Sequence, residues 1–321
     1  MPARDSNIIL LREVPSLLRR SKPVQTISSG TPPAEIEIDT ALVRALLREQ
    51  HPDLAAERIE AFEAGWDNAM FRLGPRLLMR MPRREAAASL VEKEQQWLWQ
   101  LPPLPLPIPK PERVGQPAHG FPWHWSIVPW IEGEAADVAP PDPSEAHALA
   151  DFLKALHQPA PGAAPINPYR GCRLIDRQET VDARLERLRV ATTAVTRKVL
   201  AAWREALAAK TSNAQVWIHG DLHARNVLVH GRKLASVVDW GDLSAGDPAT
   251  DLASIWALFD TSESRRKALA RYEASPDLLV RARGWAIVLG TLLLDSGRVD
   301  NDRHGKMGAD MLRRVADDRF D

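Results

Sequence analysis

The sequence predicts an α+β protein with two unequal lobes: a small β-rich N-terminal lobe and a larger, mainly helical C-terminal lobe. Short apolar runs between residues 59 and 131 alternate as strands do, whereas much of the chain after residue 144 carries apolar residues at helical spacing. A length of 321 residues allows two such units with a sizeable core. We expect one lobe over residues 35–130 and the other over 131–321.

The regular body is expected to begin after an appendage. Residues 28–33 (SSGTPP) are a cluster of structure breakers, which sets residues 1–34 apart as an N-terminal extension compatible with disorder. Asp39 is a good N-cap for a helix that carries the apolar stripe of residues 41–47. His51 and Pro52 end that helix.

A hairpin should open the small lobe. Residues 59–64 alternate as a strand, residues 65–69 (GWDNA) form a turn, and residues 70–73 return as the partner strand. A tip of small, turn-prone residues can fold over phosphates with its backbone N–H groups directed inward. Such a hairpin is structural far more often than functional, and only its place before the next strand favours binding.

That next strand, residues 77–82, ends in a cation, Arg80, and leads into a helix over about residues 85–100. The helix offers two carboxylates, Glu92 and Glu94. Arg83 and Arg84 are interpreted as solvent-exposed charges, although either could contact phosphate.

A leucine- and proline-rich run over residues 101–111 breaks this helix and forces an extended path. Its apolar residues favour packing on the lobe over a polyproline ligand for another protein. Residues 123–131 then predict a strand running into a linker. Trp123 and Trp125 fit the core of the small lobe at least as well as a binding role.

The second lobe should be helical. Ser144 is the expected cap of a helix that ends at His157, with an apolar stripe at helical spacing. Further helices are expected over about residues 178–210, 248–259, 262–274, 276–296 and 303–318.

The most informative segment carries an acid at Asp221, an amide five residues later at Asn226, and a second acid at Asp239. These groups suit phosphoryl transfer from a nucleotide, in which one carboxylate orients an acceptor hydroxyl while an amide and a second carboxylate hold magnesium. The flanking apolar runs predict three short strands that would fix the oxygen ligands at one edge of a small sheet. Residues 230–232 should form a tight hairpin between the second and third strands.

The motifs HGDLHARN at residues 219–226 and VVDW at 237–240 closely resemble the catalytic loop and metal-binding segment of the aminoglycoside and macrolide phosphotransferases. Residues 36 to about 300 follow that family's order of parts. The resemblance implies a protein-kinase-like fold, with Asp221 as the catalytic carboxylate and Asn226 and Asp239 as the magnesium ligands. His219 would brace the loop backbone.

The same resemblance implies a nucleotide site between the lobes. Arg80 stands where kinases have a lysine on the phosphates, and family spacing favours Glu94 over Glu92 as its partner. The turn at residues 65–68 would cover the phosphates, and the linker around residues 128–131 would hold the base. The expected nucleotide contacts are Gly65, Asn68, Arg80, Glu94, Val128, Trp130 and Ile131.

We therefore expect a Mg²⁺-dependent small-molecule kinase that uses ATP or GTP. The acceptor would be a hydroxylated antibiotic, such as an aminoglycoside or macrolide, or a metabolite; fold resemblance does not choose among them. From Trp240 to the C-terminus, 14 acids face 12 Lys and Arg, which hardly resembles a dedicated polycation trap. A nucleotide-binding pseudokinase or sensor is the alternative, supported by Arg80 in the lysine position. A metal-dependent phosphoesterase using His219 and His223 is a weaker one.

Composition sets further expectations. Basic and acidic residues are equal in number, 42 each, so no footprint for nucleic acid or an anionic membrane is expected. No apolar run approaches a membrane-spanning length. A single cysteine, Cys172, fits a reducing cytoplasm. Four tryptophans could line an apolar acceptor pocket, although such residues are more often core: Trp203, Trp240, Trp256 and Trp285.

Overall fold

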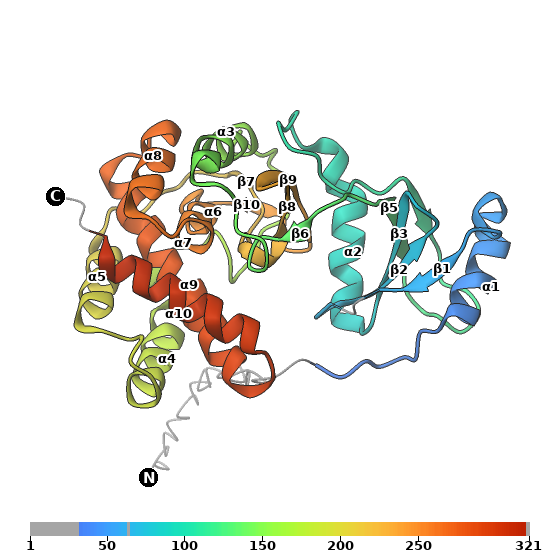
Figure 1. Cartoon of the computed structure of the whole chain (residues 1–321), viewed down its shortest axis with the longest axis horizontal. Coiled ribbons are helices and arrows are strands. Elements are labelled where there is room, and N and C mark those ends of the chain that lie inside the picture. The colour runs from blue at the N-terminus through green and yellow to red at the C-terminus, as the bar shows by residue number, and fades with distance from the viewer. Residues whose placement is uncertain (1–31, 63–64, 319–321) are drawn as a thin grey trace, which may run out of the picture.

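The computed structural model describes residues 32–62 and 65–318 and has the two lobes expected of the α+β bilobal fold (Figure 1). The small lobe is built on one five-stranded sheet, and the larger lobe is built mainly of helices. The expected extension over residues 1–34 lies almost wholly outside the described residues, as do residues 63 and 64 of the first expected strand.

The small lobe is built on a five-stranded antiparallel sheet with the order β1-β2-β3-β5-β4. Strand β3 coincides with the expected strand at residues 77–82 and pairs with β2 on one side and β5 on the other. The strands are β1 (Ile59–Ala61), β2 (Asn68–Leu73), β3 (Leu77–Pro82), β4 (Arg113–Gly115) and β5 (Trp125–Pro129).

Two helices accompany this sheet. Helix α1 (Thr40–Gln50) begins as expected at Asp39, whose Oδ1 accepts a hydrogen bond of 2.7 Å from the Leu42 N–H. Helix α2 (Glu85–Trp97) continues into the 3-10 turn η2 (Leu98–Gln100) and runs along the side of the sheet that faces the larger lobe (Figure 1). A second 3-10 turn, η1 (Pro52–Leu54), follows α1. Trp125 is buried in the core of this lobe, and Trp123 packs against it.

The leucine- and proline-rich run packs against the protein rather than standing free as a ligand. Leu101 and Ile108 are buried in the main core cluster of the larger lobe. The carbonyl oxygen of Pro107 accepts hydrogen bonds from the Ser236 hydroxyl at 2.9 Å and from the Val237 N–H at 3.4 Å. The run therefore joins the small lobe to a strand of the larger one.

The larger lobe contains two small antiparallel sheets, so the expectation that one sheet edge carries the whole motif was wrong. The chain bends through the 3-10 turn η5 (Ala224–Asn226) after Asp221, which takes the strand before the bend and the strand after it into different sheets. One sheet pairs β7 (Val216–Ile218) with β10 (Ser244–Gly246). The other joins β6 (Glu134–Ala135), β8 (Val227–His230) and β9 (Lys233–Val237).

The expected hairpin between β8 and β9 is present and has a two-residue turn. Gly231 and Arg232 both have positive φ, 56° and 67°. Two consecutive positive φ angles define the turn type that matches the twist of antiparallel strands.

Helices form the rest of the larger lobe, and α9 is packed along its length by α10 (Figure 1). A Cβ at Gly308 would lie 2.3 Å from the Leu294 nitrogen, so only glycine permits this close approach. The helices are α3 (Ala146–Leu156), α4 (Gln178–Ala191), α5 (Arg197–Ala208), α6 (Ala249–Leu252), α7 (Ser254–Leu258), α8 (Ser262–Tyr272), α9 (Pro276–Asp300) and α10 (Asp302–Asp317), with the 3-10 turns η3 (Pro143–Glu145) and η4 (Leu174–Arg177).

Three expectations about these helices need correction. Ser144 does not cap α3; it lies in η3, where Asp142 accepts its N–H at 3.0 Å. The single helix expected over residues 178–210 is two helices, because the chain is extended at Thr192 and again at Thr196, which caps α5. The helix expected over 248–259 is likewise two short ones.

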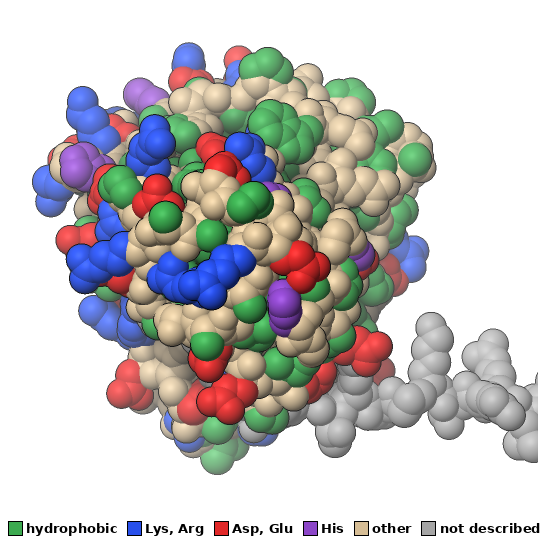
Figure 2. Space-filling model, turned by 90° about the vertical axis from the view of Figure 1, so that its right-hand side faces the viewer, with side chains coloured by type: hydrophobic (Ala, Val, Ile, Leu, Met, Phe, Trp, Pro, Cys, Tyr) green, Lys and Arg blue, Asp and Glu red, His purple; other side chains and the backbone are tan. Residues whose placement is uncertain are grey.

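All four tryptophans that were candidates for an acceptor pocket are buried, with at most 2% of each exposed: Trp203, Trp240, Trp256 and Trp285. They are core residues. Acidic and basic side chains are interspersed with apolar ones on the small-lobe face shown in Figure 2. Over the described ranges, no helix has the length and hydropathy needed to cross a membrane.

Candidate active site

Asp221 follows β7 in a tight loop that only glycine permits. Gly220 has φ 88°, and a Cβ there would lie 2.6 Å from the carbonyl oxygen of Asp242. His219 braces the loop, as expected: its Nδ1 accepts the Asp221 N–H at 3.2 Å, and its Nε2 lies 3.0 Å from the Val238 carbonyl oxygen. Because Nδ1 accepts, the proton sits on Nε2, which donates to Val238.

Asp251 anchors the same loop, a role that the sequence analysis missed. Its carboxylate is fully buried and accepts the backbone N–H groups of His219 and Gly220 at 2.6 and 2.9 Å. His157 lies 3.3 Å from the same carboxylate and 2.8 Å from the Tyr272 hydroxyl. In the sequence, Asp251 ends the segment GDPATD at residues 246–251, which follows the second acid, Asp239.

Asn226 is hydrogen-bonded to Asp221 and to the residue that precedes Asp239. Its Nδ2 donates to the Asp221 carbonyl oxygen at 2.9 Å, and its own carbonyl oxygen accepts the Val238 N–H at 2.9 Å, one residue before Asp239. These bonds draw the turn after β7 and the end of β9 together although they belong to different sheets. The three residues thus lie in one connected region.

The oxygen atoms that remain available there suit a divalent cation. Because Asn226 donates through Nδ2, its Oδ1 points to a different side of the amide. Asp239 has a positive φ of 62°, and its side chain is 54% exposed; among the described residues only its Oδ1 is engaged, by Arg80 at 3.3 Å. An amide oxygen and a carboxylate are hard ligands of the kind that Mg²⁺ binds.

Arg80 and Glu94 form a buried ion pair between β3 and α2, with Nη1 and Oε2 2.6 Å apart. The other oxygen of Glu94 accepts the Trp240 N–H at 2.9 Å, so this carboxylate also holds the backbone beside Asp239. Burial acts to lower the pKa of Arg80, but the nearby Glu94 and Asp239 raise it above its ordinary value. Glu92 pairs instead with His124.

The turn over residues 65–68 is held by the two arginines interpreted as solvent charges, and that interpretation was wrong. Arg83 donates to the Gly65 carbonyl oxygen at 3.1 Å, and Arg84 pairs with Asp67. Both are partly buried because they fasten the turn to the end of β3. The Asn68 Oδ1 is buried without a hydrogen-bond partner in the described structure.

The linker residues differ in what they can offer a base. Val128 is buried in β5 opposite Leu78. The Trp130 N–H donates to the Arg76 carbonyl oxygen at 2.7 Å, and its ring stacks against the Arg72 guanidinium at 4.3 Å. Trp130 therefore has no free N–H for a ligand, whereas the Ile131 N–H has no backbone acceptor within the described part of the chain.

Arg170 was also missed, although it contacts the principal acid directly. Its Nη2 lies 3.0 Å from Asp221 Oδ1, and His223 Nε2 lies 3.4 Å from the other oxygen. Burial acts to raise the pKa of Asp221, but His223 and Arg170 outweigh it and hold that pKa below its usual range. Asp221 is therefore a carboxylate at neutral pH.

The loop that carries Arg170 also holds Asn167, which donates to Asp242 at 2.6 Å, and the half-buried Cys172. Burial raises the pKa of the Cys172 thiol above its ordinary value. Neither residue had a role assigned from the sequence.

The histidine arrangement gives no support to a metal-hydrolase site. The His219 ring is engaged by Val238 and the loop backbone, and the His223 Nδ1 accepts the Arg225 N–H at 3.2 Å. No cluster of three His, Cys, Asp or Glu suited to a metal occurs among the described residues.

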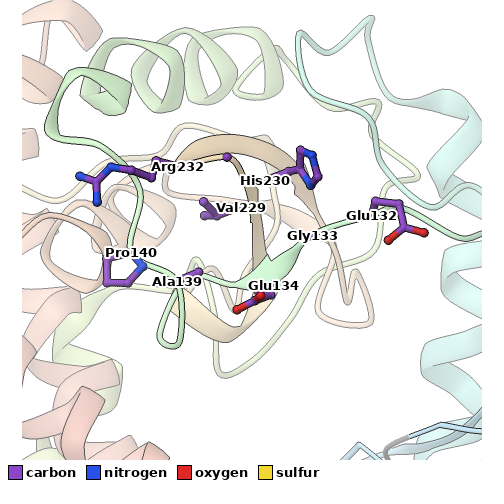
Figure 3. Close-up of a pocket in the computed structure, with 9 residues that line it drawn as sticks. Glu132, Gly133, Glu134, Ala139, Pro140, Val229, His230 and Arg232 are labelled. Carbon is purple, nitrogen blue, oxygen red and sulfur yellow. The ribbon is translucent and has the colours of Figure 1, made fainter.

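A surface pocket of about 530 Å³ lies between the linker after β5 and the β8–β9 hairpin (Figure 3). Its walls are formed by residues such as Gly133 and Glu134 on one side and Val229 and Arg232 on the other. Asp221, Asn226 and Asp239 do not line it.

The sequence matches the model of the phosphotransferase enzyme family (APH) over residues 58–285, which spans the small-lobe sheet, the Asp221 loop and Asp239. The chain belongs to this family. It is accordingly a phosphotransferase, and the family resemblance inferred from the two motifs is confirmed. No curated protein matches the chain significantly.

Solved structures with the same fold include relatives that act on antibiotics. The GDP complex of wild-type aminoglycoside 2'-phosphotransferase-IIIa superposes with a TM-score of 0.64 at 18% identity, covering 87% of this chain and 99% of that one. Macrolide 2'-phosphotransferase type I gives a TM-score of 0.54 at 22% identity, covering 85% and 98%. At these identities the likeness establishes the fold.

Proposed function

We propose that this phosphotransferase is a Mg²⁺-dependent kinase that transfers the γ-phosphate of ATP or GTP to a hydroxyl group of a small molecule. The observation that carries the proposal is the proximity of Asp221, Asn226 and Asp239, in which hydrogen bonds join Asn226 to Asp221 and to Val238, the residue before Asp239. Relatives of the same fold were solved with nucleotide, kanamycin or streptomycin bound.

Asp221 is the proposed catalytic carboxylate. It orients the acceptor hydroxyl and accepts its proton as the acceptor oxygen bonds to the γ-phosphorus. The bond from that phosphorus to the bridging oxygen breaks, and its electron pair leaves with the nucleoside diphosphate. Because the pKa of Asp221 is held low, its main contribution is orientation of the hydroxyl, with proton transfer late in the reaction.

Asn226 and Asp239 would hold the metal, which when bound neutralises charge on the phosphates. Arg80, oriented by Glu94, reaches toward the same region from the small lobe and would bind phosphate oxygens. The turn with Gly65 and Asn68 would cover the phosphates, with the unsatisfied Asn68 Oδ1 as a further polar atom.

For the base, the structure supports a contact through Ile131 rather than Trp130, since the Trp130 N–H is already engaged by Arg76. Val128 would form part of the apolar wall. Backbone contacts of this kind suit either ATP or GTP.

The pseudokinase alternative rests on arginine in the lysine position. Arg80 nevertheless makes the ion pair with Glu94 that an active kinase requires, and the two metal-ligand positions and the acid are all present. These contacts favour an active enzyme.

The test is an assay of ADP and GDP release with Mg²⁺ and a panel of hydroxylated acceptors: kanamycin, erythromycin, a sugar, choline, homoserine and glycerate. We expect release above the no-acceptor rate with at least one acceptor, and loss of that release when EDTA removes the metal. Tight nucleotide binding without turnover on any acceptor would instead establish a sensor.

A further inference from the structure

Arg170, which contacts Asp221, belongs to a group of three neighbouring arginines that we call the arginine cluster: Arg170, Arg177 and Arg184. They come from the loop before η4, from η4 itself and from α4. The Nε atoms of all three are buried and make no hydrogen bond within the described residues. Guanidinium groups rarely leave buried donors unused, because each unsatisfied donor carries a desolvation cost.

Only two of the three arginines, Arg170 and Arg184, have an ion-pair partner among the described residues. Asp221 accepts Arg170 at 3.0 Å. Asp295 lies 3.6 Å from Arg184 but is contacted more closely, at 2.5 Å, by Arg187. No ion pair to Arg177 occurs in the described structure; its guanidinium instead stacks on the Tyr169 ring at 5.3 Å.

The positive charges of the three arginines lie close enough to repel one another. Burial lowers the pKa of Arg177 and of Arg184, and the charge of Arg170 lowers both further, against the pull of Asp295 on Arg184. Asp242 partly offsets Arg170 but is itself bonded to Asn167. A bound anion would relieve this repulsion.

An anion bound by the arginine cluster would lie next to Asp221 and could therefore take part in the reaction. Arg170 occupies Oδ1 of Asp221, the group that an acceptor hydroxyl must reach. An acceptor with its own oxyanion supplies Arg170 with a new partner and leaves Asp221 to the hydroxyl. Arg177 is partly exposed and can also reach a ligand, whereas Arg184 is 3% exposed and contributes through its charge.

We propose, on the basis of the proposed kinase function, that the acceptor is an anionic hydroxylated molecule whose carboxylate or phosphate group binds Arg170 and Arg177 while its hydroxyl faces Asp221. Planar guanidinium groups match both oxyanions through paired hydrogen bonds. The same cluster repels a polycationic acceptor. This chain therefore differs in acceptor charge from relatives solved with kanamycin.

The first test measures anion binding without turnover. Malonate and sulfate are titrated by calorimetry into the full-length protein saturated with Mg²⁺ and ADP. We expect Arg177→Gln to weaken binding by about tenfold or more, as loss of a charge-assisted bond does, and Arg177→Lys to retain part of it. Arg173→Gln is the matched control, because Arg173 lies four positions before Arg177, at the start of η4, and is exposed and paired with Asp176. Equal weakening by Arg173→Gln and Arg177→Gln, or no anion binding by the wild type, would overturn the proposal.

The second test compares matched acceptors by nucleoside diphosphate release: glycerol, glycerate, glycerol 3-phosphate and kanamycin. Preference for the two anionic members supports the proposal, and preference for glycerol or kanamycin contradicts it while leaving the kinase function intact. If no acceptor is phosphorylated but malonate binding still depends on Arg177, the kinase function fails and the anion site stands.

Discussion

Glu94 of the small lobe accepts the backbone N–H of Trp240 in the larger lobe at 2.9 Å. Its other oxygen holds Arg80 at 2.6 Å. One buried carboxylate thus fixes both the cation that would bind phosphate and the backbone next to Asp239. Together with the contacts of Arg80 to Asp239 and of Lys93 to the Gly241 carbonyl oxygen, this side chain joins the two lobes at the site.

Removing the Glu94 carboxylate should therefore lower the stability of the protein substantially. We expect Glu94→Ala to lower the free energy of unfolding by about 3–5 kcal/mol, because it leaves the buried Arg80 without its closest partner. Denaturant unfolding measures this. Glu92→Ala, two residues away on α2 and exposed, should change it by less than about 1 kcal/mol, and a similar loss in both variants would contradict the assignment.

Arg80→Lys tests the departure from the lysine of other kinases. A lysine can pair with Glu94, but it cannot also contact Asp239 through a second nitrogen as Arg80 does at 3.3 Å. We expect KM for the nucleotide to rise by about tenfold, the order of one lost charge-assisted hydrogen bond, with kcat changing less. Arg80→Met should raise KM further; an unchanged KM in Arg80→Met would exclude a phosphate contact.

Asp221→Ala should lower kcat by about 10²–10⁴-fold, the usual contribution of a positioned acid or base. Nucleotide affinity should stay within about threefold, because Asp221 faces the acceptor rather than the nucleotide. Steady-state kinetics and nucleotide titration separate the two effects. A fully active Asp221→Ala enzyme would refute the assignment of Asp221.

Asp251→Asn tests the loop anchor. The fully buried carboxylate accepts two backbone N–H groups, and an amide in its place presents only one acceptor oxygen. We expect a loss of stability of about 1–3 kcal/mol from the donor left unsatisfied, together with lower turnover. Asp53→Asn, at an exposed position in η1, is the control and should leave both unchanged.

His304 should make stability depend on pH. Burial, then the charges of Arg225 and His223, lower its pKa to about 4 from an ordinary 6.5. Between these values the unfolded chain binds a proton that the folded one does not, so stability falls as the pH drops through this window and is fully present above 6.5. Thermal unfolding of His304→Gln should lose less Tm between pH 7 and pH 4.5 than that of the wild type; parallel curves would contradict this.

The sequence predicted those helices and strands well whose formation depends only on residues close together in the chain. The strand over residues 77–82 and the cap at Asp39 depend on neighbouring residues, and the structure has both. The pairing of the strands could not be predicted in this way. β7 pairs with β10, which follows Asp239 in the chain, and this pairing depends on the bend of the chain at η5.

In the site, too, only the residues that share a short segment of the sequence could be predicted. The spacing of Asp221, Asn226 and Asp239 is a sequence signal, whereas the contacts of Asp251 and Arg170 join segments far apart in the chain. Arg83 and Arg84 looked like surface charges because nothing local shows that the turn at residues 65–68 folds back onto them. Arginine, unlike an apolar residue, gives no periodic signal of burial.

Cys172 gives this enzyme a built-in place for a reporter. It is the chain's one thiol, it is half-buried, and it sits two residues from Arg170 in the backbone. Its raised pKa makes modification slow at neutral pH and faster in alkaline solution. A fluorophore attached there, on otherwise unaltered protein, would be placed to follow acceptor arrival and departure in real time.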